Sequence, residues 1–396
     1  MSDDNVLVIN AGSSSLKYSL VDAQTGVSLA SGVVERIGES SGILTHTGED
    51  GEAHRHEREV ASHEDALVAA MDAFERHGPS LKETPIAAVG HRVVHGGQRF
   101  ADPVLVDDEL VAKVSELVPL APLHNPPALA GISVARKLLP DLPQVAVFDT
   151  AFHQSIPPEG VTWAIDLELA ERWQVRRYGF HGTSHAYVAR QTAALLGRPV
   201  EQTNVVTLHL GNGASACAVR GGESVATSMG MSPQGGLVMG TRSGDIDPTV
   251  VFHLHRVAGM PIEDIERSLT REAGLLGLSG VNDMRTLLQR RDEGDAHAAL
   301  AFDVYCRRVR EYVGAYLAVL GRVDAVTFTG GVGEHSAPVR AATLAGLTPL
   351  GIELDADRNE AGGTVISTDN SPTAVCVVPT DEELEIATQT KAALDG

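Results

Sequence analysis

The amino-acid sequence predicts an α/β protein with a duplicated fold and two domains. Its 396 residues exceed what one hydrophobic core usually supports. An internal repeat gives the second indication, because VVTLHLGNG (205–213) repeats the pattern of VLVINAGSSS (6–15) half a chain later. In both stretches an apolar or β-branched run reaches one polar residue, Asn10 or His209, and then an apolar residue and Gly. One such turn is common, but two at half-length spacing indicate duplication.

Each repeat predicts a strand, a tight turn and an antiparallel return strand. At an offset of 199, Gly12 falls on Gly211, and the return strands are expected in LKYSLVD (16–22) and SACAVRG (215–221). Glycine permits a positive φ and a close backbone approach. Such a turn directs backbone N–H groups and short polar side chains to one point, which suits a phosphate. We therefore expect two phosphate-binding turns, with phosphates held between the two halves.

Composition excludes several classes of partner. The net charge of −21 and sequence pI of about 5.1 argue against nucleic acid or an anionic membrane as the main partner. No stretch approaches the roughly 20 apolar residues of a membrane span, and the acidic start MSDDN lacks the basic region of a signal peptide. A cytoplasmic location is therefore expected. Cys217, Cys306 and Cys376 lie far apart in apolar runs, which predicts reduced, buried thiols.

The first half is expected to alternate strands and helices. Residues 27–60 predict short strands that end in an exposed edge, HRHERE. His54 and His56 form an HxH motif there, but without a Cys or a second His pair a metal site is not expected. The apolar periodicity predicts helices at 63–77, 107–118 and 127–138.

Two buried strands of this half carry candidate site residues. PIAAVGHRVVHGG (85–97) contains Arg92, and a guanidinium in an apolar strand needs an anionic partner from the protein or from a ligand. QVAVFDTAFHQ (144–154) places Asp149 at the end of an apolar strand, where α/β sheets hold reactive groups. The alternative for Asp149 is a helix cap or a turn residue.

The second half offers two more candidates in glycine-rich segments. RRYGFHGTSH (176–185) presents His181 before a helix expected at 183–196, although a histidine satisfied in the core is the commoner case. SMGMSPQGGLVMGTRSGDIDP (228–248) is a long polar loop that holds Arg242. Long loops within compact domains usually bind a ligand.

The rest of the chain is expected to be mostly helical. Helices are predicted at 248–257, 261–271 and 295–320, with LLGLSGVNDMR (275–285) as a short turn. DAVTFTGGVGEHS (324–336) is a third strand that runs into a glycine turn and a helix, and so a third candidate nucleotide contact. TAVCVVPTDEELEIATQT (373–390) predicts a buried strand, an acidic cap and a last helix.

Over nearly its whole length the chain resembles the acetate kinase family, of the acetate and sugar kinase/Hsp70/actin superfamily. Nine colinear motifs carry the resemblance: NAGSSSLK (10–17), HRVVHGG (91–97), FDTAFH (148–153), YGFHGTSH (178–185), HLGNG (209–213), GTRSGDIDP (240–248), NDMR (282–285), GGVGE (330–334) and PTDEELEIA (379–387). The resemblance implies a duplicated actin-like ATPase (ribonuclease H-like) fold with an ATP cleft between domains. The implied domains are 1–150 plus 385–396, and 151–384.

The resemblance also implies an activity. This activity is reversible phosphoryl transfer from ATP to acetate, giving acetyl phosphate and ADP. It needs Mg²⁺, with Mn²⁺ as a substitute, and the protein is expected to be a homodimer.

The same resemblance implies roles for individual residues. Catalysis falls to Asp149, His181 and Arg242. Arg92 binds acetate, with Val94, Leu123 and Pro233 around its methyl group. The ATP-binding residues are Lys17, His209, Leu210, Gly211, Asn212, Gly213, Asp283, Met284, Arg285, Gly331, Val332, Gly333, Glu334 and His335. Asn10 and Glu382 lie at the metal. His335 departs from the family pattern, which usually has Asn there, so the nucleotide contact at this position is open.

Two alternatives remain at this point. One is a propionate or butyrate kinase of the same family, because pockets separate one methylene by only about 1–3 kcal/mol. The other is a nucleotide-gated binding module of the Hsp70/actin kind, against which Arg92 and Arg242 argue, because a switch needs no second anion site. Acetate is already ionised and needs no general base. We therefore expect Asp149 to act chiefly through the metal and by orienting neighbouring donors.

Overall fold

The computed structural model describes residues 4–395, which form two compact units. Unit 1 contains residues 4–152 and 381–395, and unit 2 contains His153–Thr380. Residues 381–384 group with unit 1, because the helix that begins there, α15 (Glu382–Asp395), packs on the sheet of unit 1. The assignment of functional domains stays a prediction.

Unit 1 is built on an eight-stranded sheet with the order β5-β4-β3-β2-β1-β6-β8-β7. Strands β1 to β5 follow one another as antiparallel neighbours, and β1, β6 and β8 are parallel. The strands are β1 (Asn5–Ala11), β2 (Ser15–Asp22), β3 (Ser28–Glu35), β4 (Gly42–Thr47), β5 (Ala53–Arg58), β6 (Ala88–Val93), β7 (Val104–Leu105) and β8 (Gln144–Phe148).

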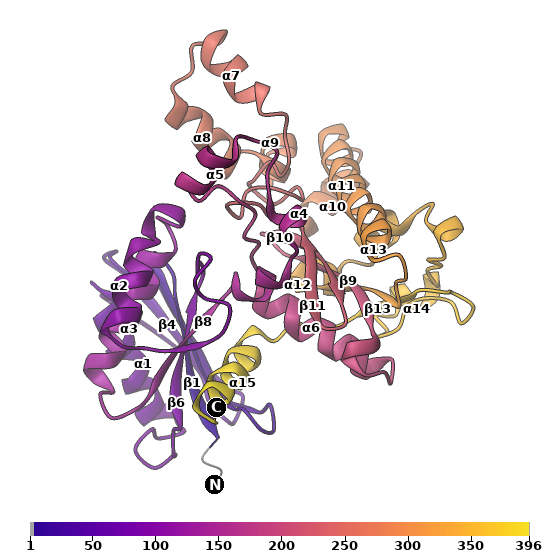
Figure 1. Ribbon diagram of the computed structural model, residues 1–396. Coiled ribbons are helices and arrows are strands. Elements are labelled where there is room, and N and C mark those ends of the chain that lie inside the picture. Colours follow the sequence, from indigo (N-terminus) through magenta and orange to yellow (C-terminus); the bar gives the residue numbers. More distant parts are fainter. Residues whose placement is uncertain (1–3, 396) are drawn as a thin grey trace. The chain divides into compact units, whose positions relative to one another are not determined.

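Helices cover both faces of this sheet, because β1 is apolar on both sides. Leu7 and Ile9 face the side of α1 (His63–His77) and α3 (Asn125–Leu138), which also carries α2 (Asp108–Glu116) against α3. Val6 and Val8 face the opposite side and pack with Ile386 of α15. Helix α15 lies against strands β1 and β6 (Figure 1). Short 3₁₀ turns lie at Val118–Leu120 and Ala151–Ser155. The helices expected at 63–77, 107–118 and 127–138 are thus present, with bounds shifted by at most two residues.

Unit 2 is built on a five-stranded sheet with the order β11-β10-β9-β12-β13. Its strands are β9 (Asn204–Leu210), β10 (Ala214–Arg220), β11 (Glu223–Thr227), β12 (Ala325–Thr329) and β13 (Ala374–Val377). β9, β10 and β11 are antiparallel neighbours, whereas β12 and β13 run parallel to β9.

The two sheets confirm the predicted duplication. The order β3-β2-β1-β6-β8 of unit 1 corresponds strand for strand, and in direction, to β11-β10-β9-β12-β13 of unit 2. The first strands of the two repeats, β1 and β9, match at the expected offset of 199. Their return strands, β2 and β10, do not. Ala11 pairs with Leu16 and Leu210 pairs with Ala214, so the first turn spans 12–15 and the second only 211–213. The return strands therefore correspond at an offset of 198, because the first turn is one residue longer.

Helices also cover both faces of the second sheet. α6 (Gly182–Leu195) packs on β9 and β12, and α11 (Ala296–Leu320) packs on β10 and β9 (Figure 1). The other helical elements are α4 (Pro158–Val161), α5 (Leu167–Arg172), 3₁₀ turns at Val200–Gln202 and Thr348–Leu350, α7 (Thr249–Arg256), α8 (Ile262–Arg271), α9 (Gly274–Ser279), α10 (Met284–Asp292), α12 (Gly330–His335), α13 (Ala337–Leu344) and α14 (Ala356–Glu360).

The expectation of a short turn over 275–285 is wrong. That segment contains most of α9 and the start of α10, which Asp283 caps by accepting a hydrogen bond from the N–H of Thr286 at 3.0 Å. Glycines hide the helical pattern of α9, which packs against α11.

The three cysteines are reduced and buried, as expected. Burial raises the pKa of each thiol to about 12. Among residues 4–395, no helix is both long enough and apolar enough to cross a membrane.

Candidate active site

Four of the predicted polar residues of unit 1 lie at one edge of its sheet, where β1, β6 and β8 end. Asn10 pairs with Lys17 across the β1–β2 ladder, and the parallel register places Asn10 level with Arg92. Arg92 pairs with Val147, which lies on the same side of the strand as Asp149. Because paired residues point to the same face, all four side chains lie on the face that α15 covers.

The anionic partner that Arg92 needs is Asp149. The Arg92 Nε donates to Asp149 Oδ1 at 2.9 Å, and Nη2 donates to Oδ2 at 2.7 Å. The Asp149 side chain is 2% exposed and that of Arg92 is 19% exposed, so the guanidinium forms the accessible side of the pair. Burial alone would lower the pKa of Arg92, but the charges of Asp149 and Glu382 outweigh it and raise that pKa. Burial also raises the pKa of Asp149, and Arg92 opposes this shift.

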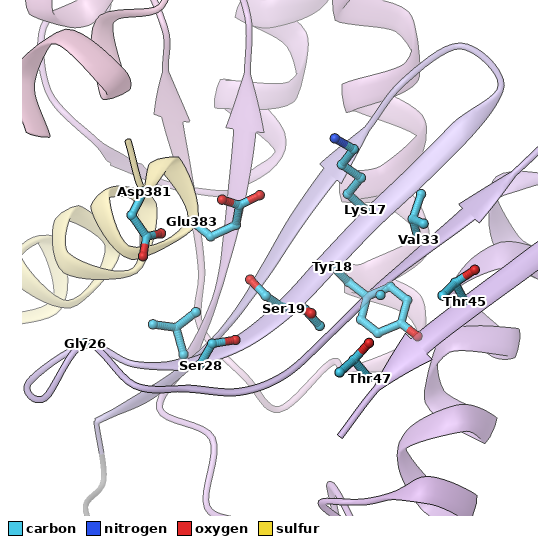
Figure 2. Close-up of a pocket in the computed structure, with 13 residues that line it drawn as sticks. Lys17, Tyr18, Ser19, Gly26, Ser28, Val33, Thr45, Thr47, Asp381 and Glu383 are labelled. Carbon is cyan, nitrogen blue, oxygen red and sulfur yellow. The ribbon is translucent and has the colours of Figure 1, made fainter. Parts of the chain in front are cut away.

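The first turn of α15 adds acidic groups to the same face. The charge of Glu382 acts on both Arg92 and Asp149. Asp381 and Glu383 line a cavity of about 420 Å³ together with Lys17 and Ser19 (Figure 2). The Ser19 hydroxyl is buried and has no hydrogen-bond partner in the described part of the chain. Burial raises the pKa of Glu383. Sequence reasoning missed Ser19, Asp381 and Glu383, although the last two stand in the quoted PTDEELEIA motif.

Val94 and Leu123, which are predicted for the acetate pocket, lie in two loops that hydrogen bonds join. Asn125 accepts a hydrogen bond from the N–H of His95 at 3.2 Å and donates one to the His95 carbonyl at 3.0 Å. This pair joins the loop after β6 to the start of α3. Val94 is half-buried and Leu123 is 59% exposed. No role was predicted for Asn125, which is fully buried beside two prolines.

In unit 2, the predicted His181 belongs to a cluster of imidazoles around Ser215. His181 adopts φ 56°, a conformation that is uncommon for a residue other than glycine. Ser215 Oγ lies 2.8 Å from His181 Nδ1 and 2.8 Å from His185 Nε2. The His181 ring stacks on His209 with centroids 4.3 Å apart. Burial holds the pKa of His185 well below its usual value, so His185 is neutral and Ser215 orients the more accessible His181.

His209 is held from its other side by hydroxyls. Its Nδ1 lies 2.8 Å from Ser184 Oγ, which lies 2.8 Å from Thr380 Oγ1. A side-chain network thus joins the start of α6, the end of β9 and the segment after β13. The sequence did not single out Ser184, His185 or Ser215, although the four-residue spacing of His181 and His185 at the start of a predicted helix was an available signal.

Arg242 reaches the same region of unit 2. Its Nη1 donates to the Pro233 carbonyl at 2.9 Å, and burial lowers its pKa. A Cβ atom at Gly213 would lie 3.6 Å from Arg242 Nη1 and 3.7 Å from His181 Nε2. The second glycine turn therefore adjoins both the guanidinium and the imidazole.

The predicted ATP-binding segments of unit 2 also adjoin one another. Thr329 pairs with His209, and a Cβ atom at Gly330, whose φ is 74°, would lie 2.9 Å from the Leu210 carbonyl oxygen. Asn212 accepts a hydrogen bond from the N–H of Gly240 at 2.9 Å, and Gly240 in turn accepts one from Leu276 in α9 at 2.9 Å. α10, which holds the predicted residues 284 and 285, follows α9 in the chain.

Several of these predicted residues have structural partners. Leu210 and Met284 are buried, so only their backbone can contact a nucleotide, whereas Asn212, Gly331 and His335 are exposed. The Arg285 side chain is 92% exposed and forms an ion pair with Asp283 at 3.2 Å. The hydrogen bond from the Thr286 N–H contributes most to the lowered pKa of Asp283.

Two charged side chains brace the turn between β12 and α12. Glu334 accepts hydrogen bonds from the N–H of Gly330 at 2.8 Å and of Thr380 at 3.3 Å. Arg340, only 2% exposed, donates to the carbonyls of Gly333 at 2.9 Å and Glu334 at 2.8 Å. Sequence reasoning missed Arg340, although an arginine in the apolar run APVRAATL could have been noticed.

These features define a class of protein. Both sheets end in tight polar turns of the kind that bind phosphate, and each unit brings an arginine to that edge. The duplicated mixed α/β fold is that of the actin-like phosphotransferases.

Comparisons with known proteins specify the family. The model of the acetokinase family matches residues 5–388. An acetate kinase from Streptomyces coelicolor is 56% identical over 99% of this chain and 97% of its own length. The crystal structure of an acetate kinase from Porphyromonas gingivalis superimposes with a TM-score of 0.94, at 41% identity, covering 99% of this chain and 100% of that one. A propionate kinase from Francisella tularensis gives a TM-score of 0.93 at 40% identity, covering 98% and 99%. The chain belongs to the acetokinase family, whose members are kinases.

Proposed function

We propose that this chain catalyses reversible phosphoryl transfer from ATP to acetate, giving acetyl phosphate and ADP. Its similarity to curated acetate kinases over 99% of the chain carries the proposal. The placement of Arg92 supports it, because a guanidinium whose partner Asp149 is more deeply buried presents its remaining N–H groups to an incoming carboxylate.

We assign acetate binding to Arg92 and the positioning of Arg92 to Asp149. Both Asp149 oxygens already accept hydrogen bonds from Arg92, which favours the orienting part of the role expected for Asp149 over action through the metal. Acetate is ionised at neutral pH, so proton abstraction by Asp149 is not needed. Asp149 would keep the guanidinium fixed while substrate exchanges. Val94, Leu123 and Pro233 would surround the acetate methyl group.

The transferring phosphoryl group would meet His181 and Arg242. Catalysis of this reaction consists mainly of positioning and of neutralising charge on the phosphoryl oxygens. Arg242 is fixed by the Pro233 carbonyl and His181 by Ser215, so both donors are organised before substrate binds. The ATP-binding residues would be Lys17, 209–213, 283–285 and 331–335, with backbone contacts alone from Leu210 and Met284.

Asn10 and Glu382 would hold the divalent metal that acetate kinases typically use. An amide oxygen and a carboxylate suit Mg²⁺, which takes one or two carboxylates together with phosphate oxygens and water. Glu382 fits this assignment because its charge already acts on the Arg92–Asp149 pair. Mg²⁺ would neutralise phosphate charge when bound, and Mn²⁺ offers the same oxygen chemistry.

We also propose that units 1 and 2 correspond to the N-terminal and C-terminal acetokinase domains, with ATP in a cleft between them. Family resemblance supports a cytoplasmic homodimer. A preference for propionate is the second candidate, which the similarity to a propionate kinase at 40% identity keeps open.

ADP formation from ATP in the presence of acetate, propionate, butyrate or no carboxylate tests the proposal. We expect turnover to require a carboxylate and kcat/KM to be highest for acetate. A higher kcat/KM for propionate than for acetate would make propionate the preferred substrate. Equal ADP formation without any carboxylate would contradict kinase activity towards these acids.

A further inference from the structure

The loop that carries Arg242 is closed at its base by Gly236 and Asp245, which are nine residues apart in the chain. The N–H of Asp245 donates to the Gly236 carbonyl at 3.0 Å, as between two antiparallel strands. The side chain makes the reverse bond, because the Gly236 N–H donates to Asp245 Oδ1 at 2.7 Å. One of the two hydrogen bonds that close the loop therefore depends on the Asp245 carboxylate.

The backbone at Gly236 is tightly enclosed. Gly236 is buried and has a φ of 93°, and a Cβ atom there would lie 2.7 Å from the carbonyl oxygen of Ser228. No side chain fits at that distance, so residue 236 must be glycine. Without the Asp245 carboxylate, the buried N–H of Gly236 would lose its acceptor, which is unfavourable.

Helix α11 holds the same carboxylate from its other side. The Tyr312 hydroxyl donates to Asp245 Oδ2, so each carboxylate oxygen accepts a hydrogen bond. Arg308, one turn earlier on α11, donates from Nη1 to the carbonyls of Asp245 at 3.1 Å and of Gly236 at 3.3 Å. Burial, followed by the hydrogen bond to Asp245, raises the pKa of Tyr312, so its hydroxyl stays protonated and remains a donor.

The closed base determines where Arg242 lies. Arg242 stands three residues before Asp245, and its Nη1 donates to the carbonyl of Pro233, which stands three residues before Gly236. Pairing Gly236 with Asp245 therefore brings the arginine and the acceptor of its guanidinium together. A looser base would let the guanidinium change direction.

The middle of the loop has hydrogen bonds of its own. The N–H of Leu275 donates to the Met239 carbonyl at 2.9 Å, and the N–H of Ser243 donates to the Leu269 carbonyl at 3.1 Å. Asp245 is itself exposed, so removing its carboxylate leaves these bonds in place. We therefore expect the loop to stay folded when its base loosens.

We propose that Asp245, held by Tyr312, is a positioning residue that directs the Arg242 guanidinium towards the transferring phosphoryl group. This inference rests on the role proposed above for Arg242. A guanidinium neutralises charge on the phosphoryl oxygens only when its N–H groups point at them, so a small change of direction lowers the rate. Asp245 would act on kcat rather than on acetate binding, and only while the fork of Arg242 is present.

A double-mutant cycle between positions 245 and 242 tests this proposal. Asp245→Ala should lower kcat for ADP formation with acetate about tenfold and leave the KM for acetate within twofold. In the Arg242→Lys background, which lacks the planar fork, the same substitution should lower kcat less than twofold. Asp357→Ala, which alters an exposed carboxylate of α14 in the same unit, should leave kcat unchanged in both backgrounds.

Conservative variants separate positioning from folding. Asp245→Asn keeps an oxygen for the Gly236 N–H, so its kcat should stay within threefold of the wild type. Tyr312→Phe keeps the ring that packs on Tyr316 and removes only the hydroxyl, so kcat should fall about threefold, again only when Arg242 is present.

If Asp245→Ala does not fold by circular dichroism, the cycle of Tyr312→Phe with Arg242→Lys decides the outcome. Equal losses of kcat in the two backgrounds would overturn the positioning role and leave the proposed function standing. A wild type that forms no ADP with any carboxylate would instead overturn the proposed function, and this inference with it.

Discussion

The two sheets share one plan but carry different chemistry at equivalent strand ends. In unit 1 these positions hold an amide and three charged groups, whereas in unit 2 they hold an imidazole and three hydroxyls. The registers of both sheets match Asn10 with His209, Lys17 with Ser215, Arg92 with Thr329, and Asp149 with Thr380. A duplicated scaffold therefore fixes where polar groups stand, and the side chains decide what each half can bind.

The helices that cover these faces extend the comparison. α15 begins beside the strand ends of unit 1 and brings Glu382, and α6 begins beside those of unit 2 and brings His181 and Ser184. In both units a helix start supplies part of the candidate site. Unit 1 combines a guanidinium with oxygen ligands, which suits a carboxylate and a metal, whereas unit 2 presents neutral hydrogen-bonding groups with one arginine, which suits phosphate.

Asp149 and Thr380 occupy equivalent positions in the two units, and we expect the largest effect when the charge of Asp149 is removed. Asp149→Asn leaves the partly buried Arg92 guanidinium without its paired carboxylate, so we expect kcat to fall about 10³-fold and the unfolding free energy to fall by about 3 kcal/mol. Steady-state assays and urea denaturation measure both. Thr380→Val, at the matched position, should cost less than tenfold in kcat. Comparable losses in the two variants would contradict the comparison, and loss of a titration near neutrality in Asp149→Asn would make Asp149 a proton-transfer group.

Acid should destabilise both units, because each buries a neutral histidine. Burial lowers the pKa of His91 in unit 1 and of His153 in unit 2 to about 4. The unfolded chain, with a histidine pKa near 6.5, binds more protons, so this stability is complete above pH 6.5 and is lost as the pH falls towards 4. Between pH 6.5 and 5 we expect each histidine to cost about 2 kcal/mol. Urea denaturation at pH 7 and 5 measures the loss, and equal stability at both would contradict it.

Replacing the arginine of unit 2 tests whether its geometry matters as well as its charge. In Arg242→Lys an ammonium cannot both bond the Pro233 carbonyl and present a planar fork, so we expect kcat to fall about 10- to 100-fold with little change in KM for acetate. Arg307→Lys, at an exposed position of α11, serves as the control. Turnover near the wild-type value in Arg242→Lys would exclude a charge-neutralising role for this fork.

The positioning role of Ser215 should give a smaller effect. Ser215→Ala removes the hydroxyl shared by His181 and His185, so we expect kcat to fall about fivefold, which is about 1 kcal/mol. A shifted pH profile of kcat would show that the hydroxyl tunes His181, which a merely structural role would not do. An unchanged profile would make Ser215 a packing residue.

The smallest effect is expected at Val94, which we propose lines the acetate pocket. Val94→Ala makes room for one methylene, which contributes about 0.8 kcal/mol when it fits. The kcat/KM of propionate relative to acetate should therefore rise about fourfold. Competition assays with both acids measure the ratio, and an unchanged ratio would remove Val94 from the pocket.

The fold was predicted well from the sequence because it rests on two signals, one that is local along the chain and one that is repeated. The period of apolar residues gave the long helices, and the half-chain repeat gave the two sheets. The short helix α9 was missed because its glycines break that period. The offset of the return strands was misjudged because a turn can gain one residue without changing the residue types around it.

In the candidate site, only residues whose own side chain indicates a chemical role could be predicted from the sequence. The need of Arg92 for an anion was visible, but its partner depends on the β6–β8 register. Ser215, Asn125 and Arg340 act through contacts that join distant segments, so no local pattern reveals them.

The position of α15 has a consequence for how the chain matures on the ribosome. Unit 2 precedes α15 in the sequence, so all of its strands leave the exit tunnel before Ile386 and Ala387 can cover the apolar face formed by Val6, Val8 and Val147. During that interval this apolar face of the first sheet stays uncovered, and Arg92 lacks the nearby charge of Glu382. The acidic group of Glu382 therefore joins Arg92 and Asp149 only after every strand of unit 2 has been synthesised.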